Sequence, residues 1–324
     1  MLKISAGILA FGLALAATAP VKAEDVLITQ YKGDPTGAPF AIAIEKGFFK
    51  KAGIDVTNVI SGAGGGASVR AAMATPLGFG ETSPAGVISA IQQGQDIRIV
   101  GIGSRLLNHY VIVMPTSKIM SLKDLDGKTF AISNPKSLTE LTAVLIAEKA
   151  GLKPNAMKRV ALGSLGGAIT AVEKGVADVT SVPLPVYLAK DGAHKYRTLL
   201  TAKDMPHLPP GIEIATGKLM KEHPEKLRAL LAGRREGVKY IYEHTDDAAK
   251  ILTKLYAPLA PEKVSAMVHE LAAVKFWSEG NIEMSLLETS ERAMLDVGIL
   301  NGKVDLKKMI DTSFLPADLQ KVTE

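Results

Sequence analysis

The feature that most constrains this chain is a regular alternation of short β-rich runs with helical segments between residues 26 and 182. β-branched and apolar residues gather in short runs typical of strands, and segments with apolar residues three and four positions apart lie between them. Such an alternation favours parallel sheet covered by helices. We therefore predict an α/β fold, with strands at residues 26–31, 55–60, 77–81, 97–103, 110–114, 129–133, 158–162 and 179–182 and helices at 39–51, 67–74, 85–93, 138–150 and 165–174.

The alternation is interrupted at two strands, Tyr110–Met114 and Gly211–Thr216. We expect these strands to cross side by side between two lobes, since single cores usually stop growing near about 250–300 residues. Lobe 1 would comprise residues 24–109 with 210–324, and lobe 2 residues 110–209. Beyond Lys218 the spacing predicts helices at 224–244, 261–271, 285–297 and 306–310 and no further strand.

The first 23 residues have the form of an export signal. Lys3 supplies a positive end, residues 4–17 an uncharged apolar stretch, and small residues follow at a cleavage point after Ala23, with Ala19 as a rival. A membrane anchor is the alternative, but the stretch is shorter than the roughly 20 apolar residues that span a bilayer and is followed by Pro20. We expect cleavage, with Glu24 and Asp25 as a short polar lead to the first strand, and a soluble periplasmic protein.

Composition limits the partners of the mature chain. Loss of Lys3 and Lys22 lowers the formal charge from +5 to +3, which is too weak to indicate nucleic acid binding. The chain has no cysteine, so it has neither disulfides nor a lipid-anchoring N-terminal cysteine. We expect a monomer without cofactor or metal.

Candidate binding residues follow the predicted strands. Ligands in open α/β sheets bind where strands end and helices begin, because unpaired backbone N–H groups are offered there. The residues at such ends are Tyr31, Gly64, Gly65 and Ser83 in lobe 1 and Ser133, Asn134, Ser137, Ser181 and Pro183 in lobe 2. Arg105 could pair with a carboxylate, sulfonate or nitrate or lie at the surface. Tyr31 and Tyr187 could line a pocket or pack at a lobe edge.

The sequence Ser137-Leu138-Thr139-Glu140 has the form of a capping box. In that arrangement the serine hydroxyl accepts from the third backbone N–H and the glutamate reaches back to the cap. A helix N-terminus also favours a negatively charged ligand group. Both interpretations of Ser137, a plain cap and a ligand contact, remain open from the residues alone.

Motifs for other chemistry fail on context. Gly62, Gly64 and Ala67 satisfy a dinucleotide-binding pattern but follow the second predicted strand, and Gly127-Lys128-Thr129 lacks the first glycine of a phosphate loop. The six histidines are scattered without metal-ligand spacing, and no nucleophile elbow occurs. An enzyme is therefore the less favoured class, although distant residues can form a catalytic triad in space.

Several segments carry a family resemblance. The sequence AIEKGFFKKAGIDV at 43–56, followed by ISGAGGG and GETSPAG, is similar to substrate-binding proteins of ABC transporters of the sulfonate, nitrate and taurine type. The resemblance continues through residues 121–152 and 168–186 and more weakly through 276–282. It implies a periplasmic binding protein type II fold, with two α/β lobes joined by crossing strands that close over a small molecule and deliver it to a permease in the inner membrane.

The resemblance favours a ligand role for the glycine loop at Gly64 and Gly65 and for the helix end at Ser137. We predict a small anionic or polar solute from the sulfonate, nitrate, aromatic acid or pyrimidine classes. An enzyme of pyrimidine or thiamine-precursor synthesis on the same fold is the alternative, but those enzymes carry a cysteine-rich motif. A sensory receptor module would share the binding chemistry and differ only in its partner.

Overall fold

A computed structural model describes residues 23–324. The predicted export signal therefore lies outside the described residues except for Ala23. The predicted polar lead is wrong in one respect: β1 begins at Ala23, so Glu24 and Asp25 already belong to the strand. They pair with β2 because the extended backbone continues beyond the apolar run.

The first of two sheets holds six strands in the order β11-β4-β10-β3-β1-β2. β1 pairs in parallel with β2 and β3, whereas β10 runs antiparallel to β3 and β4, and β11 antiparallel to β4. The strands are β1 (Ala23–Thr29), β2 (Asp55–Gly62), β3 (Phe79–Thr82), β4 (Ile97–Ser104), β10 (Ile212–Thr216) and β11 (Trp277–Gly280).

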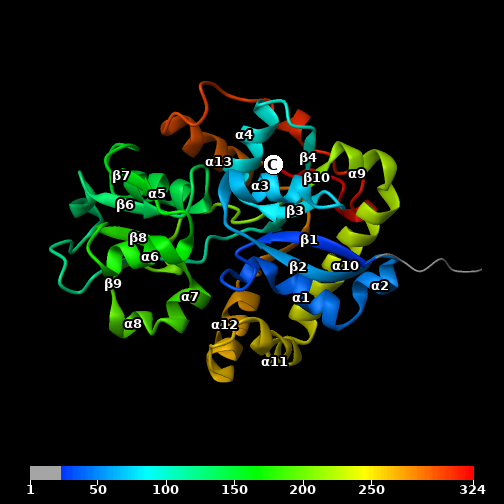
Figure 1. Ribbon diagram of the computed structural model, residues 1–324, viewed down its shortest axis with the longest axis horizontal. Helices are drawn as coiled ribbons and strands as arrows, with labels where there is room; N and C mark the ends of the chain where they lie inside the picture. Colours follow the sequence, from blue (N-terminus) through cyan, green and yellow to red (C-terminus); the bar gives the residue numbers. More distant parts are fainter. Residues whose placement is uncertain (1–22) are drawn as a thin grey trace, which may run out of the picture.

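The second sheet holds five strands in the order β7-β6-β8-β5-β9. β6 pairs in parallel with β7 and β8, and β5 runs antiparallel to β8 and β9. The strands are β5 (His109–Val113), β6 (Thr129–Ile132), β7 (Lys158–Ala161), β8 (Val179–Pro183) and β9 (Arg197–Leu200). In Figure 1 this sheet lies in the green half of the molecule, apart from the blue strands of the first.

The two sheets are linked by the connections 105–108 and 201–211. The expectation that the two strands at these points lie side by side is wrong: β5 pairs with β8 and β9, and β10 pairs with β3 and β4. Each strand is taken up by its own sheet because it finds two hydrogen-bonding neighbours there. Near the connections, the backbone N–H of Gly103 donates a hydrogen bond to the carbonyl oxygen of Gly211, at 2.9 Å.

Helices flank both sheets. Those that follow strands of the first sheet are α1 (Ala38–Glu45), α2 (Phe48–Ala52), α3 (Gly65–Ala74) and α4 (Pro84–Gln92). Those of the second are α5 (Leu138–Lys149), α6 (Leu165–Glu173), α7 (Leu184–Ala189) and α8 (Gly192–Lys195). The helix predicted at 39–51 is two helices, because Gly47 adopts a φ of 68° between them and breaks the first.

The C-terminal region is largely helical, as expected. It comprises α9 (Gly217–Glu222), α10 (Pro224–Glu243), α11 (Thr245–Leu255), α12 (Pro261–Ala273) and α13 (Met284–Asp296). The prediction of no strand beyond Lys218 is wrong, since β11 extends the edge of the first sheet. Short 3₁₀ turns occur at Pro35–Gly37, Leu122–Leu125, Ala202–Asp204, Leu306–Met309 and Ala317–Leu319.

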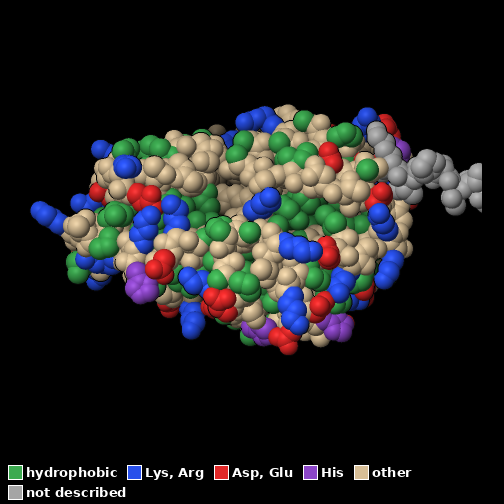
Figure 2. Space-filling model, turned by 60° about the horizontal axis from the view of Figure 1, so that its bottom comes forward, with side chains coloured by type: hydrophobic (Ala, Val, Ile, Leu, Met, Phe, Trp, Pro, Cys, Tyr) green, Lys and Arg blue, Asp and Glu red, His purple; other side chains and the backbone are tan. Residues whose placement is uncertain are grey.

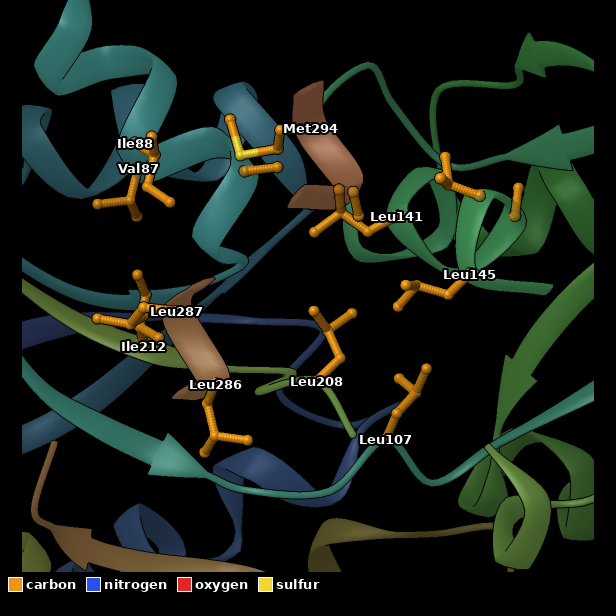
Figure 3. Close-up of a cluster of buried hydrophobic side chains, with 14 of the residues drawn as sticks. Val87, Ile88, Leu107, Leu141, Leu145, Leu208, Ile212, Leu286, Leu287 and Met294 are labelled. Carbon is orange, nitrogen blue, oxygen red and sulfur yellow. The ribbon is translucent and has the colours of Figure 1, made fainter. Parts of the chain in front are cut away.

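The largest apolar cluster reaches from one sheet to the other. α13 lies against both α4 and α5, and Figure 3 shows Met294 among the labelled side chains of this cluster, between Ile88 of α4 and Leu141 of α5. Leu107 and Leu208, one on each connection between the sheets, are fully or almost fully buried in the same cluster. The two halves are therefore packed together by apolar side chains in this structure.

The surface carries both signs of charge. Figure 2 shows basic and acidic side chains interspersed over one face, which agrees with the small net charge. Among residues 23–324, no helix combines the length and the apolar character that crossing a membrane requires.

Candidate functional site

A cavity lies where the two sheets face each other. It is lined by both sheets' loops and strand ends: Thr29, Gln30, Asp34, Thr36, Gly64, Gly65, Glu81, Thr82, Ser83, His109, Ser133, Ser137, Leu138, Thr139, Pro210 and Gly211. The space open to the centre of a water molecule is about 20 Å³, which is room for about one or two waters. An organic solute can occupy this position only when the two halves lie further apart, so the arrangement is a closed one.

Strand ends place these residues. Thr29, Thr82 and Ser133 lie at or just beyond the carboxyl ends of β1, β3 and β6, where parallel strands bring side chains to one edge. His109 is the first residue of β5, and Gly211 directly precedes β10. Because β5 runs antiparallel to β8 and β10 antiparallel to β3, the starts of these two strands lie beside the carboxyl ends of their neighbours. The rule that ligands bind at strand ends thus leads to this cavity.

The second sheet contributes a group of hydroxyls, Ser133, Ser137 and Thr139, which we call the hydroxyl wall. Ser137 Oγ lies 2.8 Å from Thr139 Oγ1, and Ser133 Oγ lies 3.2 Å from the same atom. Thr139 Oγ1 also accepts from the Ser133 backbone N–H at 2.9 Å. The three side chains are almost fully buried and are hydrogen-bonded to one another.

Ser137 caps α5 as the sequence predicts. Its Oγ accepts from the Glu140 N–H at 3.3 Å. The other half of the predicted capping box differs: Glu140 Oε2 accepts from the N–H of Lys136 at 2.6 Å, one residue before the cap. The first turn of α5 therefore faces the cavity with a satisfied cap and with the positive end of its dipole.

The N-termini of α3 and α4 face the same space from the first sheet. Gly65 has a φ of 57°, and a Cβ at this position would lie 2.5 Å from Pro135 O. The glycine loop thus lies close to the backbone of the opposite half, and its ligand role stays a prediction. Ser83 Oγ donates to Lys136 O at 3.0 Å, so a second contact also joins the halves here.

The first sheet contributes two carboxyl groups, Asp34 and Glu81, which we call the carboxylate wall. Asp34 Oδ1 accepts from the Thr36 N–H at 3.0 Å, and its Oδ2 lies 3.7 Å from His109 Nε2 of the opposite half. Both carboxyl oxygens of Glu81, the Thr82 hydroxyl and His109 Nε2 are buried without a hydrogen-bond partner in the part of the chain that the structure describes.

A buried ion cluster stands behind Glu81. Glu213 on β10 lies directly opposite Glu81, and Arg234 of α10 lies 2.7 Å from Glu213 Oε1 and 3.6 Å from Glu81 Oε2. The guanidinium also donates to Ser278 O at 2.7 Å and Gly103 O at 2.5 Å. One cation therefore serves two carboxyl groups, and it lies closer to Glu213.

Burial governs the protonation of this cluster. Burial raises the pKa of Glu81 to about 8, and the nearby Glu213 and Asp34 add to the rise while Arg234 opposes it. Burial likewise raises the pKa of Glu213, against the effect of Arg234. Since Arg234 lies closer to Glu213, we assign the proton at neutral pH to Glu81.

The structure brings together five of the predicted site residues, namely Gly64, Gly65, Ser83, Ser133 and Ser137, around the cavity. Ser181 lies one step behind it, with its Oγ 3.3 Å from His109 Nδ1. Pro183 pairs with His109 across β8 and β5.

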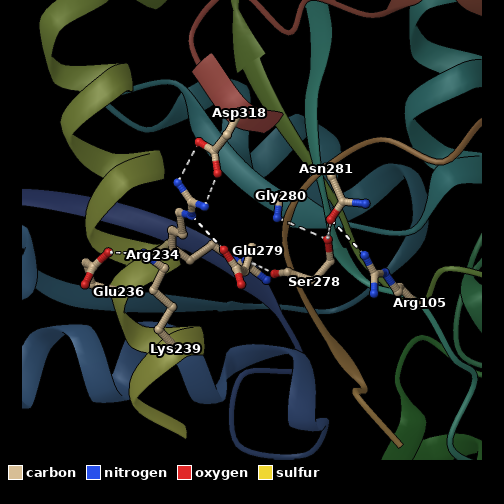
Figure 4. A network of polar contacts seen from close by, with 10 residues as sticks. Arg105, Arg234, Glu236, Lys239, Ser278, Glu279, Gly280, Asn281 and Asp318 are labelled. Carbon is tan, nitrogen blue, oxygen red and sulfur yellow. Dashed lines mark hydrogen bonds and ion pairs between the residues drawn. The ribbon is translucent and has the colours of Figure 1, made fainter. Parts of the chain in front are cut away.

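Four predicted residues lie elsewhere. Arg105 pairs with Glu283 at 2.5 Å and donates to Asn281 Oδ1 at 2.9 Å, as Figure 4 shows for Asn281. Asn134 donates to Ala63 O and Gly163 O, at 2.9 and 3.1 Å. Tyr187 stacks on Tyr110 with ring centroids 4.1 Å apart.

Tyr31 is half-buried among apolar side chains, and burial raises its pKa to about 12. It packs against Gly37, where an added Cβ would lie 2.5 Å from the tyrosine ring. Its position is thus that of a packing residue close to the turn that holds Asp34.

Sequence reasoning missed Asp34, Glu81 and His109. A signal was present for Glu81, because it is a single carboxylate at the end of an otherwise uncharged predicted strand, 77–81. Asp34 precedes Pro35 and resembles an ordinary turn residue. Among residues 23–324 no group of three or more His, Asp or Glu side chains is placed to hold a metal ion.

Comparison with known proteins gives a family match. A family model described as NMT1/THI5 like matches residues 34–248. A protein of Bacillus subtilis (strain 168) described as a putative aliphatic sulfonates-binding protein is 24% identical over 291 residues, which cover 88% of this chain and 86% of that protein.

Solved structures share the fold. The alkanesulfonate-binding protein SsuA from Xanthomonas axonopodis pv. citri, bound to MOPS, has a TM-score of 0.73 at 14% identity, over 91% of this chain and 99% of that one. The desulfurization enzyme DSZB has a TM-score of 0.60 at 15% identity, over 90% and 97% of the two chains. These likenesses confirm the predicted two-lobed fold, and the fold serves both a binding protein and an enzyme.

Proposed function

The chain belongs to the NMT1/THI5-like family, and from that premise we propose that it is the extracytoplasmic solute-binding component of an ABC importer. It holds a small anionic or polar organic solute between two lobes. The observation that carries the proposal is the cavity between the sheets, walled by both and bordered by Pro210 and Gly211 of one connection and by His109, which directly follows the other. A solute seated there touches both halves and so stabilises an arrangement in which they close around it, further apart than in this structure.

The anionic part of the solute binds at the helix N-termini. α3, α4 and α5 direct their first turns at the cavity, and their unpaired N–H groups and dipoles favour negative charge. Gly64, Gly65, Ser83, Ser133 and Ser137 supply the hydrogen bonds. The similarity to a sulfonate-binding protein of Bacillus subtilis supports a sulfonate as the first class to test.

The lobes move about the connections 105–108 and 201–211. Lobe 1 is residues 24–109 with 210–324, and lobe 2 is residues 110–209, with the boundary residue His109 already the first residue of β5 in the second sheet. Support comes from the sheets, because the first sheet draws its strands from residues 23–104 and 212–280 and the second from 109–200. Two short connections are the places where a change of backbone angles separates two rigid halves.

The partner of the loaded protein is an ABC permease in the inner membrane, and the protein works as a monomer in the periplasm. The export signal at residues 1–23, cleaved after Ala23, delivers it there. N-terminal sequencing of the protein from its native host tests this: the mature chain begins at Glu24, and an intact Met1 in the membrane fraction contradicts it.

A thermal-shift screen of the mature protein tests the binding function. The panel holds alkanesulfonates, nitrate, aromatic acids and pyrimidines. A solute at 100 times its dissociation constant adds about 2.7 kcal/mol to the free energy of unfolding. No shift with any member would contradict the proposal. Recovery and chemical identification of the bound solute distinguish the two classes of protein, because a binding protein releases its solute unchanged and an enzyme converts it.

A further inference from the structure

The titratable residues that line the cavity are unusual for a site that takes an anion. Asp34, Glu81 and His109 are its titratable side chains, and no lysine or arginine is among the lining residues. A purely anionic solute would lie beside two carboxyl groups without a cationic side chain. Helix N-termini at the other end favour negative charge, so the site is polarised rather than uniformly suited to anions.

The nearest guanidinium cannot serve as the missing cation. Arg234 lies behind Glu81, where its nitrogens contact Glu213 Oε1, Ser278 O and Gly103 O. Its side chain is 1% exposed. Breaking these contacts to reach a solute would leave Glu213 buried without a counter-charge, which is strongly unfavourable.

The carboxyl groups have unused acceptor capacity toward the cavity. Neither oxygen of Glu81 has a hydrogen-bond partner among residues 23–324, although the side chain is 1% exposed. For Asp34, Oδ1 accepts from Thr36 N–H, while Oδ2 lies 3.7 Å from His109 Nε2, beyond hydrogen-bonding distance. A buried acceptor without a donor costs free energy, and a solute with N–H groups would supply the donors.

The contacts divide the lining into two ends. Gly64 approaches Ser133, and Ser133, Ser137 and Thr139 hydrogen-bond to one another. Asp34 approaches His109, and Glu81 packs against Gly211, where an added Cβ would lie 2.2 Å from Glu81 Oε1. One end thus offers hydroxyls and helix N-termini, and the other offers carboxyl groups.

We propose that the solute carries a protonated nitrogen as well as an anionic group. Asp34 binds this nitrogen, a carboxyl oxygen of Glu81, which can accept although the group holds a proton, takes a second N–H, and the helix N-termini bind the anion. The inference rests on the proposed solute-binding function and names the class of solute: a zwitterion, or another anion with a cationic amine. Charge-assisted hydrogen bonds from an ammonium group to carboxylates are among the stronger polar contacts in proteins.

Three probes with one carbon skeleton test the proposal: 3-aminopropanesulfonate, 3-hydroxypropanesulfonate and propanesulfonate. Titration calorimetry of the mature protein should give at least tenfold tighter binding for the amine than for the other two. Asp34→Asn should reduce that preference to less than threefold, chiefly by weakening the binding of the amine. Asparagine keeps an oxygen that can accept from Thr36 N–H, and a thermal melt of the variant checks that the fold is intact.

Asp126→Asn is the matched control, because Asp126 is exposed and does not line the cavity. It should leave all three affinities unchanged. Equal or tighter binding of propanesulfonate would overturn the inference and leave the proposed function standing. If none of the sulfonates binds, the sulfonate class fails, and 4-aminobutanoate against butanoate then decides the inference, which falls unless the amine binds at least tenfold tighter.

Discussion

The two walls of the cavity differ in how their polar groups are satisfied. On the hydroxyl wall, Ser133, Ser137 and Thr139 hydrogen-bond to one another and to the start of α5. On the carboxylate wall, Glu81 has no hydrogen-bond partner in the described part of the chain. Both walls are buried, so the difference lies in chemistry rather than exposure.

This difference separates two contributions to function. A wall that satisfies itself is stable without a solute and presents fixed dipoles. A wall with an unpaired buried carboxyl group lowers the stability of the fold until a donor arrives. We infer that the second sheet supplies a preorganised anion site. The first sheet holds the buried carboxyl group of Glu81, which becomes more stable when a solute supplies a hydrogen-bond donor.

The largest expected effect comes from removing the cation behind the carboxylate wall. Arg234→Met leaves Glu81 and Glu213 buried without a counter-charge, and we expect a loss of about 3–5 kcal/mol in the free energy of unfolding at pH 8. Urea denaturation measures it. Arg235→Met is the control: Arg235 pairs with Glu279 and the exposed Asp318, and its loss should cost about 1 kcal/mol or less. Equal losses would show that the cluster has no special role.

A second prediction sharpens the comparison through pH. Burial first, then Glu213 and Asp34, raise the pKa of Glu81 from 4.5 to about 8 against the effect of Arg234. Between those values the folded state binds more protons than the unfolded state, so the free energy of unfolding falls as pH rises from 5 to 8. Glu81→Gln should flatten this fall when both proteins are unfolded across the range. An identical slope in the variant would contradict the assignment of the proton to Glu81.

The hydroxyl wall is tested by its cap. Ser137→Ala should cost about 1 kcal/mol of stability and also weaken solute binding. Ser164→Ala is matched to it, because Ser164 Oγ caps α6 by accepting from Gly167 N–H at 3.0 Å and does not line the cavity. The control should lose similar stability and no affinity.

Ser137→Asp refines this test, because aspartate caps a helix about as well as serine. The added negative charge should weaken binding of a sulfonate while the melting temperature stays near that of the parent. If the affinity and the melting temperature are both unchanged, the start of α5 is purely structural and the anion does not bind there.

The smallest expected effect concerns Arg105, which the sequence offered as an anion partner. Its pairing with Glu283 and Asn281 leads us to expect that Arg105→Gln changes solute affinity less than twofold. A tenfold loss of sulfonate binding in calorimetry would restore Arg105 to the site and weaken the contrast between the walls.

The sequence predicts the elements better than their pairing. Alternating patterns located β1 to β8 and most helices, because each depends on local periodicity. β9 and β11 were not predicted, since each lies at the edge of its sheet and forms by pairing with a strand distant in the chain. The helix break at Gly47 depends on one residue with positive φ, which the apolar pattern does not reveal.

The same distinction holds for the site. Ser83, Ser133, Ser137 and the glycine loop followed from the rule that ligands bind at strand ends. The role of Glu81 could not be predicted in this way, because it depends on Glu213 of β10 and Arg234 of α10, which lie 132 and 153 positions further along the chain. No local spacing encodes such a cluster, so a single buried carboxylate in a strand was its one sequence signal.

The apolar packing of α13 against α4 and α5 has a calorimetric consequence. If the halves separate to admit a solute, part of the cluster around Leu141 and Met294 meets water and is buried again on closing. Burial of apolar surface lowers heat capacity. The enthalpy of solute binding should therefore become more negative as temperature rises. The size of this heat-capacity change should reflect the side chains buried between the halves and should exceed the change that burial of a small polar solute alone would give.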